Sequence, residues 1–284
     1  MLLSFYFIHK MSAVIKAYEV ENIKFSKPFR IIIGGGSGCG KTIFVKDLID
    51  DKEFYSSFKR IVYNYPDYLD EPYVEFNNAI EFIPGLINQE FTSSLEPNSL
   101  IIIDDLAREV SKSVDLLNLF TVEARKRNIS ILLITQSLYI DTDIFRQIKL
   151  NCTGFVLFKF RAGIEKNMRI LRDMGMSHLM SNKLFQKIYK PRYKYIYVDL
   201  HPDSQSEFCS IRSNILSEYP EVYYKMKYIA IKESDFHKYF KVIDNKSGEI
   251  TAVKNGSKKK KITKKRKVEE IKSESETETE TESD

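Results

Sequence analysis

The chain has 284 residues and a formal net charge of +5, and 43% of its residues are hydrophobic and 13% aromatic. This length and apolar content suit one α/β domain with extensions, or two small domains, and exclude a protein that is disordered throughout. The charge is too small to indicate nucleic-acid binding by itself, and no apolar run reaches the length of about 20 residues that a transmembrane helix needs, so no membrane partner is expected.

The first strongly apolar segment, residues 30–33, predicts a buried strand, and residues 43–49 predict a helix. The turn between them fits G-x-x-x-x-G-K-[ST], the phosphate-binding loop of nucleoside triphosphatases. Its residues are Gly35, Gly36, Ser37, Gly38, Cys39, Gly40, Lys41 and Thr42. The glycines let backbone N–H groups point inward, and the helix N-terminus adds partial positive charge. The pattern predicts that the chain binds a nucleoside triphosphate, with Lys41 contacting the β- and γ-phosphates and the Thr42 hydroxyl holding Mg²⁺. Because no guanine-specificity motif is found, we favour ATP.

The rest of the body alternates apolar runs with helical patterns. Near-continuous apolar runs predict a mainly parallel sheet with helices on both faces, hence the α/β fold of a P-loop NTPase. Residues 193–199 alternate between apolar and polar, which predicts an antiparallel edge strand. The other predicted strands are 59–65, 79–83, 99–105, 129–135 and 153–158, and the predicted helices are 110–127, 163–172 and 177–189.

Polar side chains stand at the ends of two of these strands. Asp104 ends a buried run, where it can hold the water shell of Mg²⁺, and Asp105 would be the second acid that polarises the attacking water. In isolation, two such acids are more often a helix-capping turn, but here they lie downstream of a phosphate loop. Gln136 follows the next strand and could contact the γ-phosphate and report its loss. The alternative for Gln136 is an ordinary polar loop residue.

These residues carry a resemblance to a known family. The chain resembles the DNA-packaging ATPases of the FtsK–HerA superfamily, in particular those of Polinton/Maverick elements, adintoviruses and their poxvirus-type relatives. The likeness covers roughly residues 28 to 215, and the tract from Asp104 to Gln136 is its specific part. The segments that carry it are 100–109, 119–121, 127–130, 134–139, 145–151 and 198–202.

The resemblance implies a RecA-like motor that assembles as a homo-oligomeric ring and uses ATP to pull double-stranded DNA into a preformed capsid, at a portal-like vertex. In cellular members the second acid is usually glutamate, whereas here it is Asp105, as the viral members often have, which allows a slow or differently placed base. Such rings also need an arginine finger from the neighbouring subunit, because charge builds on the γ-phosphate in the transition state. Arg127 matches the viral pattern and is the first choice, Arg125 matches the cellular one, and Arg146 is a third candidate. The alternative for each is a surface arginine at a helix end.

We expect three segments: an N-terminal extension over 1–27, the ATPase domain over 28–245, and a disordered basic then acidic tail over 246–284. Within the tail, residues 258–268 resemble a nuclear-import signal, or else bind nucleic acid nonspecifically. In two tracts, 187–194 and 223–228, basic residues alternate with aromatic ones. These tracts could follow the phosphate backbone of DNA, or they could be half-buried elements whose lysines reach the solvent.

The residues and the resemblance together favour an ATP-driven translocase of double-stranded DNA that packages a viral or transposon-like genome. Its expected location is intracellular, in the host nucleus and in the virion, and the three widely spaced cysteines suit a reducing compartment. Two alternatives stay open. One is a helicase or cellular DNA pump of the same motor class, and the other is a structural ring that binds ATP without hydrolysing it.

Overall fold

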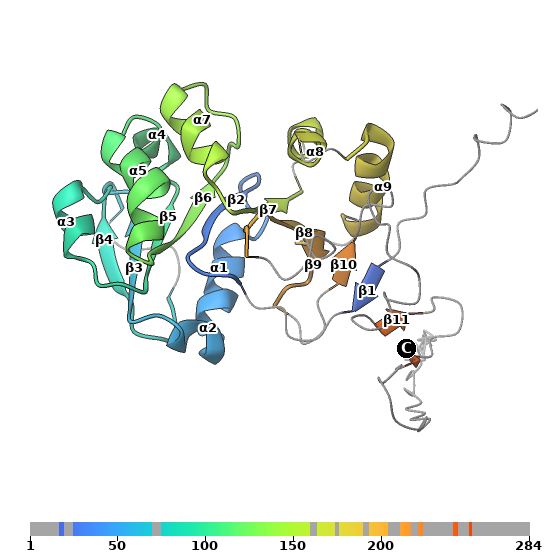
Figure 1. Ribbon diagram of the computed structural model, residues 1–284, viewed down its shortest axis with the longest axis horizontal. Coiled ribbons are helices and arrows are strands. Elements are labelled where there is room, and N and C mark those ends of the chain that lie inside the picture. Colours follow the sequence, from blue (N-terminus) through green and yellow to red (C-terminus); the bar gives the residue numbers. More distant parts are fainter. Residues whose placement is uncertain are drawn as a thin grey trace, which may run out of the picture.

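In a computed structural model of the protein, the described residues are 17–19, 25–69, 75–159, 164–173, 176–189, 193–203, 211–216, 221–223, 241–243 and 250–251. Within them, twelve strands form one sheet in the order β12-β11-β1-β10-β9-β8-β7-β2-β6-β5-β3-β4. Figure 1 shows this order from β11 at the right to β4 at the left. The predicted import signal at 258–268 and the acidic end of the tail lie outside the described residues.

One half of the sheet is parallel and carries the phosphate loop. Its strands run side by side in the order β7-β2-β6-β5-β3-β4, and every pairing among them is parallel. The carboxyl ends of these strands therefore meet at one edge of the sheet, which we call the carboxyl edge. The strands are β2 (Arg30–Gly34), β3 (Arg60–Tyr65), β4 (Glu81–Pro84), β5 (Ser99–Asp104), β6 (Ser130–Thr135) and β7 (Gly154–Phe158).

The other half of the sheet is antiparallel. Strand β8 (Tyr195–Asp199) pairs with β7 as predicted in direction, but β9 (Ile211–Ser213) covers its other side, so the prediction of an edge strand is wrong. The strands that follow are two or three residues long, too short to show an alternating pattern in the sequence. They are β10 (Glu221–Tyr223), β1 (Ala17–Glu19), β11 (Lys241–Ile243) and β12 (Ile250–Thr251).

Helices cover both faces of the sheet, which confirms the predicted α/β fold class. On one face, α1 (Lys41–Asp50) and α2 (Lys52–Ser56) pack on a core that includes Phe44, Leu48 and Tyr63. On the opposite face the core includes Phe120 and Phe145. The helices there are α3 (Gln89–Ser94), α4 (Ala107–Val110), α5 (Val114–Asn118), the π-helix η1 (Leu119–Glu123), α6 (Ala124–Lys126), α7 (Asp143–Leu150), α8 (Ile164–Asp173) and α9 (His178–Ile188).

The prediction of a single continuous helix over 110–127 is wrong, because the chain is not helical between α4 and α5. Helix α4 ends at Val110, and Ser113 then starts α5 by accepting a hydrogen bond from the backbone N–H of Leu116. The next turn is wider, because the N–H of Ala124 donates to the carbonyl of Leu119, five residues back. Among the described residues, no helix is long and apolar enough to cross a bilayer.

Candidate active site

The phosphate loop joins the end of β2 to the start of α1 at the carboxyl edge. Gly38 and Gly40 have φ angles of 68° and 99°, in the left-handed region that glycine adopts without strain. A Cβ atom added at Gly36 or Gly38 would meet nothing within 4 Å, so there is open space beside both residues. Gly40 caps α1 without a side-chain hydrogen bond, which leaves the first N–H groups of the helix available to an anion. These features fit a bound phosphate chain.

The Lys41 side chain folds back towards the phosphate loop, so that its ammonium group lies against the backbone of the loop. Its Nζ donates hydrogen bonds to the carbonyls of Gly35 and Gly36, at 2.9 and 3.0 Å, and the residue is only 9% exposed. The cation is therefore positioned at the inner side of the loop by the same backbone that would surround a phosphate.

The glycines at the end of β2 allow close packing from both sides. A Cβ atom on Gly34 would lie 2.5 Å from Leu138 Cδ2, and one on Gly35 would lie 2.6 Å from Cys39 Sγ and 2.7 Å from Phe158 Cβ. The N–H of Gly35 also donates to the carbonyl of Thr135 at the end of β6, at 3.3 Å. The loop is thus held between the segment that follows β6 and the end of β7.

Asp104, the last residue of β5, is 3% exposed and lies beside the start of α1. Its Oδ2 accepts a hydrogen bond from the Tyr63 hydroxyl at 2.5 Å and one from Thr42 Oγ1 at 3.4 Å. Burial raises the pKa of this carboxyl, while the hydrogen bond from Tyr63 acts in the opposite direction. An oxygen pair from Thr42 and Asp104 is the kind of partial ligand set that Mg²⁺ uses when phosphates and water complete its shell.

Sequence reasoning missed Tyr63. The residue lies on β3, paired with Ile102 of β5, and its side chain is almost fully buried. A buried tyrosine hydroxyl usually finds a hydrogen-bond partner, so a tyrosine in an apolar strand was the available signal. Its partner could not be named without knowing that β3 lies next to β5.

Asp105 and Gln136 meet across the tips of β5 and β6. Gln136 Nε2 donates to both carboxylate oxygens of Asp105, at 3.1 and 3.3 Å. Asp105 has a φ angle of 55°, a left-handed conformation that aspartate tolerates better than most residues. The turn directs the second acid away from Asp104 and towards the amide.

Arg127 is engaged within its own subunit. Its guanidinium donates to the carbonyls of Thr92, Ser93 and Leu95, at 2.6, 3.0 and 2.6 Å, and forms an ion pair with Glu123 at 3.5 Å. These carbonyls lie at the C-terminal end of α3, where a cation satisfies unpaired acceptors. The contacts disfavour Arg127 as the first choice for a group that reaches a neighbouring subunit.

The other two candidate arginines are exposed. Among the described residues, Arg125 has no recorded hydrogen bond or ion pair, and it lies before β6 at the amino edge of the sheet, opposite the phosphate loop. Arg146, on α7, forms exposed ion pairs with Asp141 and Asp143, at 3.5 and 2.6 Å. Surface pairs of this kind contribute about 1 kcal/mol or less, so Arg146 can be redirected at little cost.

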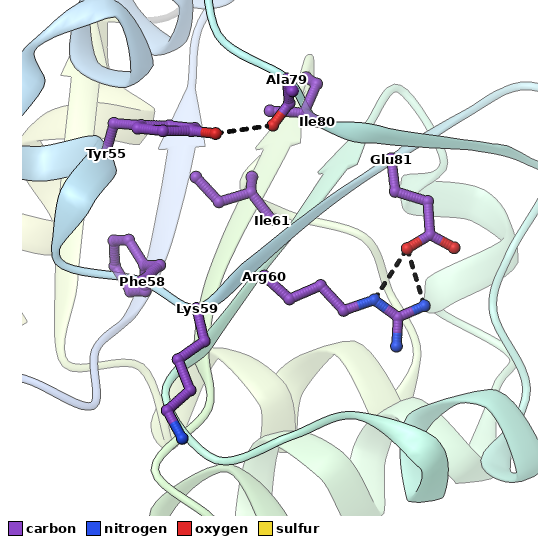
Figure 2. A pocket seen from close by; sticks show the side chains of 8 residues that line it. All are labelled: Tyr55, Phe58, Lys59, Arg60, Ile61, Ala79, Ile80 and Glu81. Carbon is purple, nitrogen blue, oxygen red and sulfur yellow. Dashed lines mark hydrogen bonds and ion pairs between the residues drawn. The ribbon is translucent and has the colours of Figure 1, made fainter.

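A separate hollow of about 320 Å³ lies at the amino ends of β3 and β4. Figure 2 shows two interactions among the residues that line it: the Tyr55 hydroxyl donates to the Ala79 carbonyl at 3.0 Å, and Arg60 forms an ion pair with Glu81 at 2.7 Å. Because the hollow lies at the start of β3 and the phosphate loop follows the end of β2, the two lie at opposite edges of the sheet. The hollow is not part of the phosphate site.

The chain is similar to known proteins in sequence and in fold. Residues 16–171 match the family described as "Poxvirus A32 protein", which confirms the resemblance to poxvirus-type packaging ATPases. Among solved structures, the genome packaging NTPase B204 from Sulfolobus turreted icosahedral virus 2, in complex with sulfate, is 14% identical, with a TM-score of 0.48 over 66% of this chain and 96% of that chain. The flagellar accessory protein FlaH from Methanocaldococcus jannaschii is 13% identical, with a TM-score of 0.41 over 66% of this chain and 84% of that chain. No curated protein matches the chain at a significant level.

Proposed function

The chain belongs to the poxvirus A32 protein family, and on that premise we propose that it is an ATPase that drives double-stranded DNA of a viral or transposon-like genome into a capsid. The observation that carries the proposal is a single cluster at the carboxyl edge, where a phosphate loop faces the acidic tip of β5 and the amide tip of β6. Family membership supports the packaging role, and the cluster supports the ATPase chemistry.

The loop and the start of α1 bind the triphosphate. Backbone N–H groups of the loop donate to the phosphate oxygens, and Lys41 exchanges its two carbonyl contacts for the β- and γ-phosphates, which are stronger acceptors for a cation. Thr42 and Asp104 are the residues that would hold Mg²⁺, which would neutralise part of the phosphate charge. Tyr63 donates a hydrogen bond to Asp104 and would keep its carboxylate oriented towards such an ion.

Asp105 is the proposed general base. The oxygen of a water molecule bonds to the γ-phosphorus, the bond from phosphorus to the ADP oxygen breaks, and the water proton passes to Asp105. Gln136 holds the carboxylate in place through its two hydrogen bonds. The second N–H of the Gln136 amide would donate to the γ-phosphate, and the loss of this hydrogen bond when the phosphate leaves would link the chemical state of the site to the tip of β6.

The transition state needs an additional cation, which we assign to an arginine of the neighbouring subunit in a homo-oligomeric ring. Arg125 is the first candidate, since it is exposed and makes no hydrogen bond or ion pair with the described residues of its own subunit. Arg146 is the second and Arg127 the third, because the guanidinium of Arg127 already satisfies helix carbonyls. An alanine at the true finger should abolish hydrolysis and leave ATP binding intact, whereas turnover that survives all three substitutions places the finger elsewhere.

The proposed partners are double-stranded DNA and a capsid or portal-like vertex protein. The proposed DNA contacts are the basic side chains of the tracts 187–194 and 223–228, although 190–192 and 224–228 lie outside the described residues. The aromatic Tyr189 is not among them, because it is buried and its hydroxyl donates to the Leu157 carbonyl at 2.6 Å. Residues 258–268 are the proposed import signal for the host nucleus, and a protein truncated before them should stay out of the nucleus. A truncated protein that still enters would contradict this role.

The deciding experiment measures ATP hydrolysis with and without linear double-stranded DNA, beside Lys41→Ala. Stimulation by duplex DNA that disappears in Lys41→Ala supports the translocase. Hydrolysis that is indifferent to DNA contradicts it and points to a capsid-dependent or protein-remodelling ATPase. ATP binding without hydrolysis would instead favour the structural ring, and strand separation on a forked duplex would favour a helicase.

A further inference from the structure

Two large apolar side chains are exposed next to the phosphate loop. Tyr193 is 65% exposed and Ile43 is 54% exposed, although the strands and the helix beside them belong to the buried core. Neither residue takes part in the phosphate chemistry described above. Exposed rings and aliphatic chains at the rim of a ligand site are typical of contacts to an apolar part of the ligand.

The strand order determines which part of a nucleotide would reach them. Strands β6 and β5 lie on one side of β2 and carry Gln136, Asp104 and Asp105, so the γ-phosphate lies on that side. Strand β7 lies on the other side of β2, and β8 follows it. A triphosphate bound along the loop with its γ end towards the carboxylates therefore extends its nucleoside towards β7 and β8.

Tyr193 stands at that end of the loop. It precedes β8, whose first residue, Tyr195, pairs with Phe158 at the end of β7. A Cβ atom added at Gly40, the last glycine of the loop, would lie 3.2 Å from Tyr193 Cδ1, so the ring lies directly against the loop. Ile43 is three residues after Gly40, in the first turn of α1, and is next in sequence to Phe44, whose ring contacts Phe158 and Tyr195 on this side.

The backbone at Tyr193 also indicates a held position. Its φ angle is 60°, in the left-handed region that is unfavourable for a bulky side chain. The neighbouring Tyr195 is fixed by ring contacts, with centroids 4.8 Å from Phe44 and 5.4 Å from Phe158. Because α1 and β7 anchor the next residue but one, the Tyr193 ring is presented at a defined place beside Gly40.

We propose that Tyr193 and Ile43 form the base-binding half of the nucleotide site, with the tyrosine ring stacked on a purine and the isoleucine packed against it. The proposal rests on the proposed function, because it assumes that the loop binds a nucleotide. Stacking uses the flat face that every base presents, and a purine offers more of it than a pyrimidine. This contact therefore selects for a purine and does not by itself distinguish adenine from guanine.

The test compares ATP with inorganic tripolyphosphate, which has the same phosphates and no base. Calorimetric titration of the full chain should show that Tyr193→Ala weakens ATP binding on the order of tenfold and leaves tripolyphosphate binding unchanged. Tyr193→Phe keeps the ring and should bind ATP as the wild type does. The matched control is Tyr68→Ala, since Tyr68 is 73% exposed and follows β3, on the far side of β5.

A second measurement uses the absence of tryptophan from the sequence. Tyr193→Trp introduces a single tryptophan, whose emission should change with ATP or GTP and stay constant with tripolyphosphate. An emission that ignores ATP while calorimetry detects its binding overturns the proposal. Equal losses of ATP and tripolyphosphate in Tyr193→Ala also overturn it, because the ring would then support the loop and not the base. A wild-type chain that binds neither ligand overturns both this inference and the proposed function. If Tyr193→Ala does not fold, Ile43→Ala provides the same comparison.

Discussion

The two sides of the phosphate loop differ in their chemistry. Towards β6 and β5 the loop faces carboxylates and an amide, which are hydrogen-bonded to Thr42, Tyr63 and each other. Towards β7 and β8 it faces the rings of Phe158 and Tyr193. We call these the polar side and the ring side. Because the proposed general base lies on the polar side and the proposed base contact lies on the ring side, changes on the polar side should affect turnover, and changes on the ring side should affect binding.

The largest effect is expected from Asp105→Asn on the polar side. Asparagine keeps the shape of the side chain but cannot take up the water proton that we propose passes to Asp105, so kcat should fall by about 10²- to 10⁴-fold. ATP affinity should stay within about threefold of wild type, since the residue does not contact the phosphate loop. Phosphate release measures the first and calorimetry the second. A parallel loss of affinity would break the distinction between the two sides.

The polar side was largely predictable and the ring side was not. Lys41 and Thr42 follow the glycines at a fixed spacing, and Asp104 follows an apolar run. These are local signals, so all three residues can be found without a structure. Gln136 was expected at the tip of a strand, and the structure adds that it bonds to Asp105. By contrast, Tyr193 precedes an alternating strand, and nothing in the sequence indicates that this strand lies beside the loop.

Other features of the structure could not be predicted for the same reason, which is that they depend on how distant segments of the chain pack together. Strand β8 was predicted at an edge because β9, at three residues, is too short to show a pattern. Motif position makes Arg127 a candidate finger, but it does not reveal that three carbonyls at the end of α3 accept hydrogen bonds from this arginine. In each case the deciding contact joins segments that are far apart in the chain.

A second prediction tests how tightly the loop is held between its two sides. In Gly34→Ala the new methyl group would lie 2.5 Å from Leu138, which is only 1% exposed and has little room to move. We expect the free energy of unfolding to fall by about 1–3 kcal/mol, as for other overpacked sites. The measurement is a denaturant or thermal unfolding transition.

The control for this change is Gly36→Ala, where a Cβ atom meets nothing within 4 Å. Its unfolding transition should match the wild type, while its affinity for ATP falls because the methyl group occupies phosphate space. If Gly34→Ala is as stable as the wild type, the end of β2 is not clamped by Leu138.

A smaller effect is expected from Tyr63→Phe, which removes the hydrogen bond that orients Asp104. A hydrogen bond to a charged group contributes about 1.5–3 kcal/mol, so the Mg²⁺ concentration for half-maximal turnover should rise about tenfold or more. Burial already raises the pKa of Asp104 and the tyrosine hydroxyl lowers it, so the variant carboxyl should protonate at a higher pH. Mg²⁺-dependent turnover should accordingly be lost earlier as the pH falls.

Tyr65→Phe is the matched control, because Tyr65 lies two residues along the same strand and belongs to the same core cluster. Its Mg²⁺ dependence and its acid limb should remain those of the wild type. Equal shifts in both variants would show that ring packing, and not the hydroxyl, supports the metal site.

The smallest effect is expected at Cys39, which lies in the loop on the ring side, near Phe158. Burial raises the pKa of its thiol above the ordinary 9.0, and the nearby Lys41 cation only partly opposes this shift. The reactive thiolate should therefore be scarce at neutral pH, so alkylation of Cys39 by iodoacetamide should be slow at pH 7 and accelerate as the pH rises beyond 9. Mass spectrometry of the peptide that contains Cys39 measures this rate, with N-acetylcysteine as the free-thiol control, and Cys39→Ser should change kcat by less than about threefold. Labelling as fast as that of the free thiol at pH 7 would mean that the Lys41 ammonium outweighs burial, and that the ring side of the loop carries a charge able to take part in the chemistry.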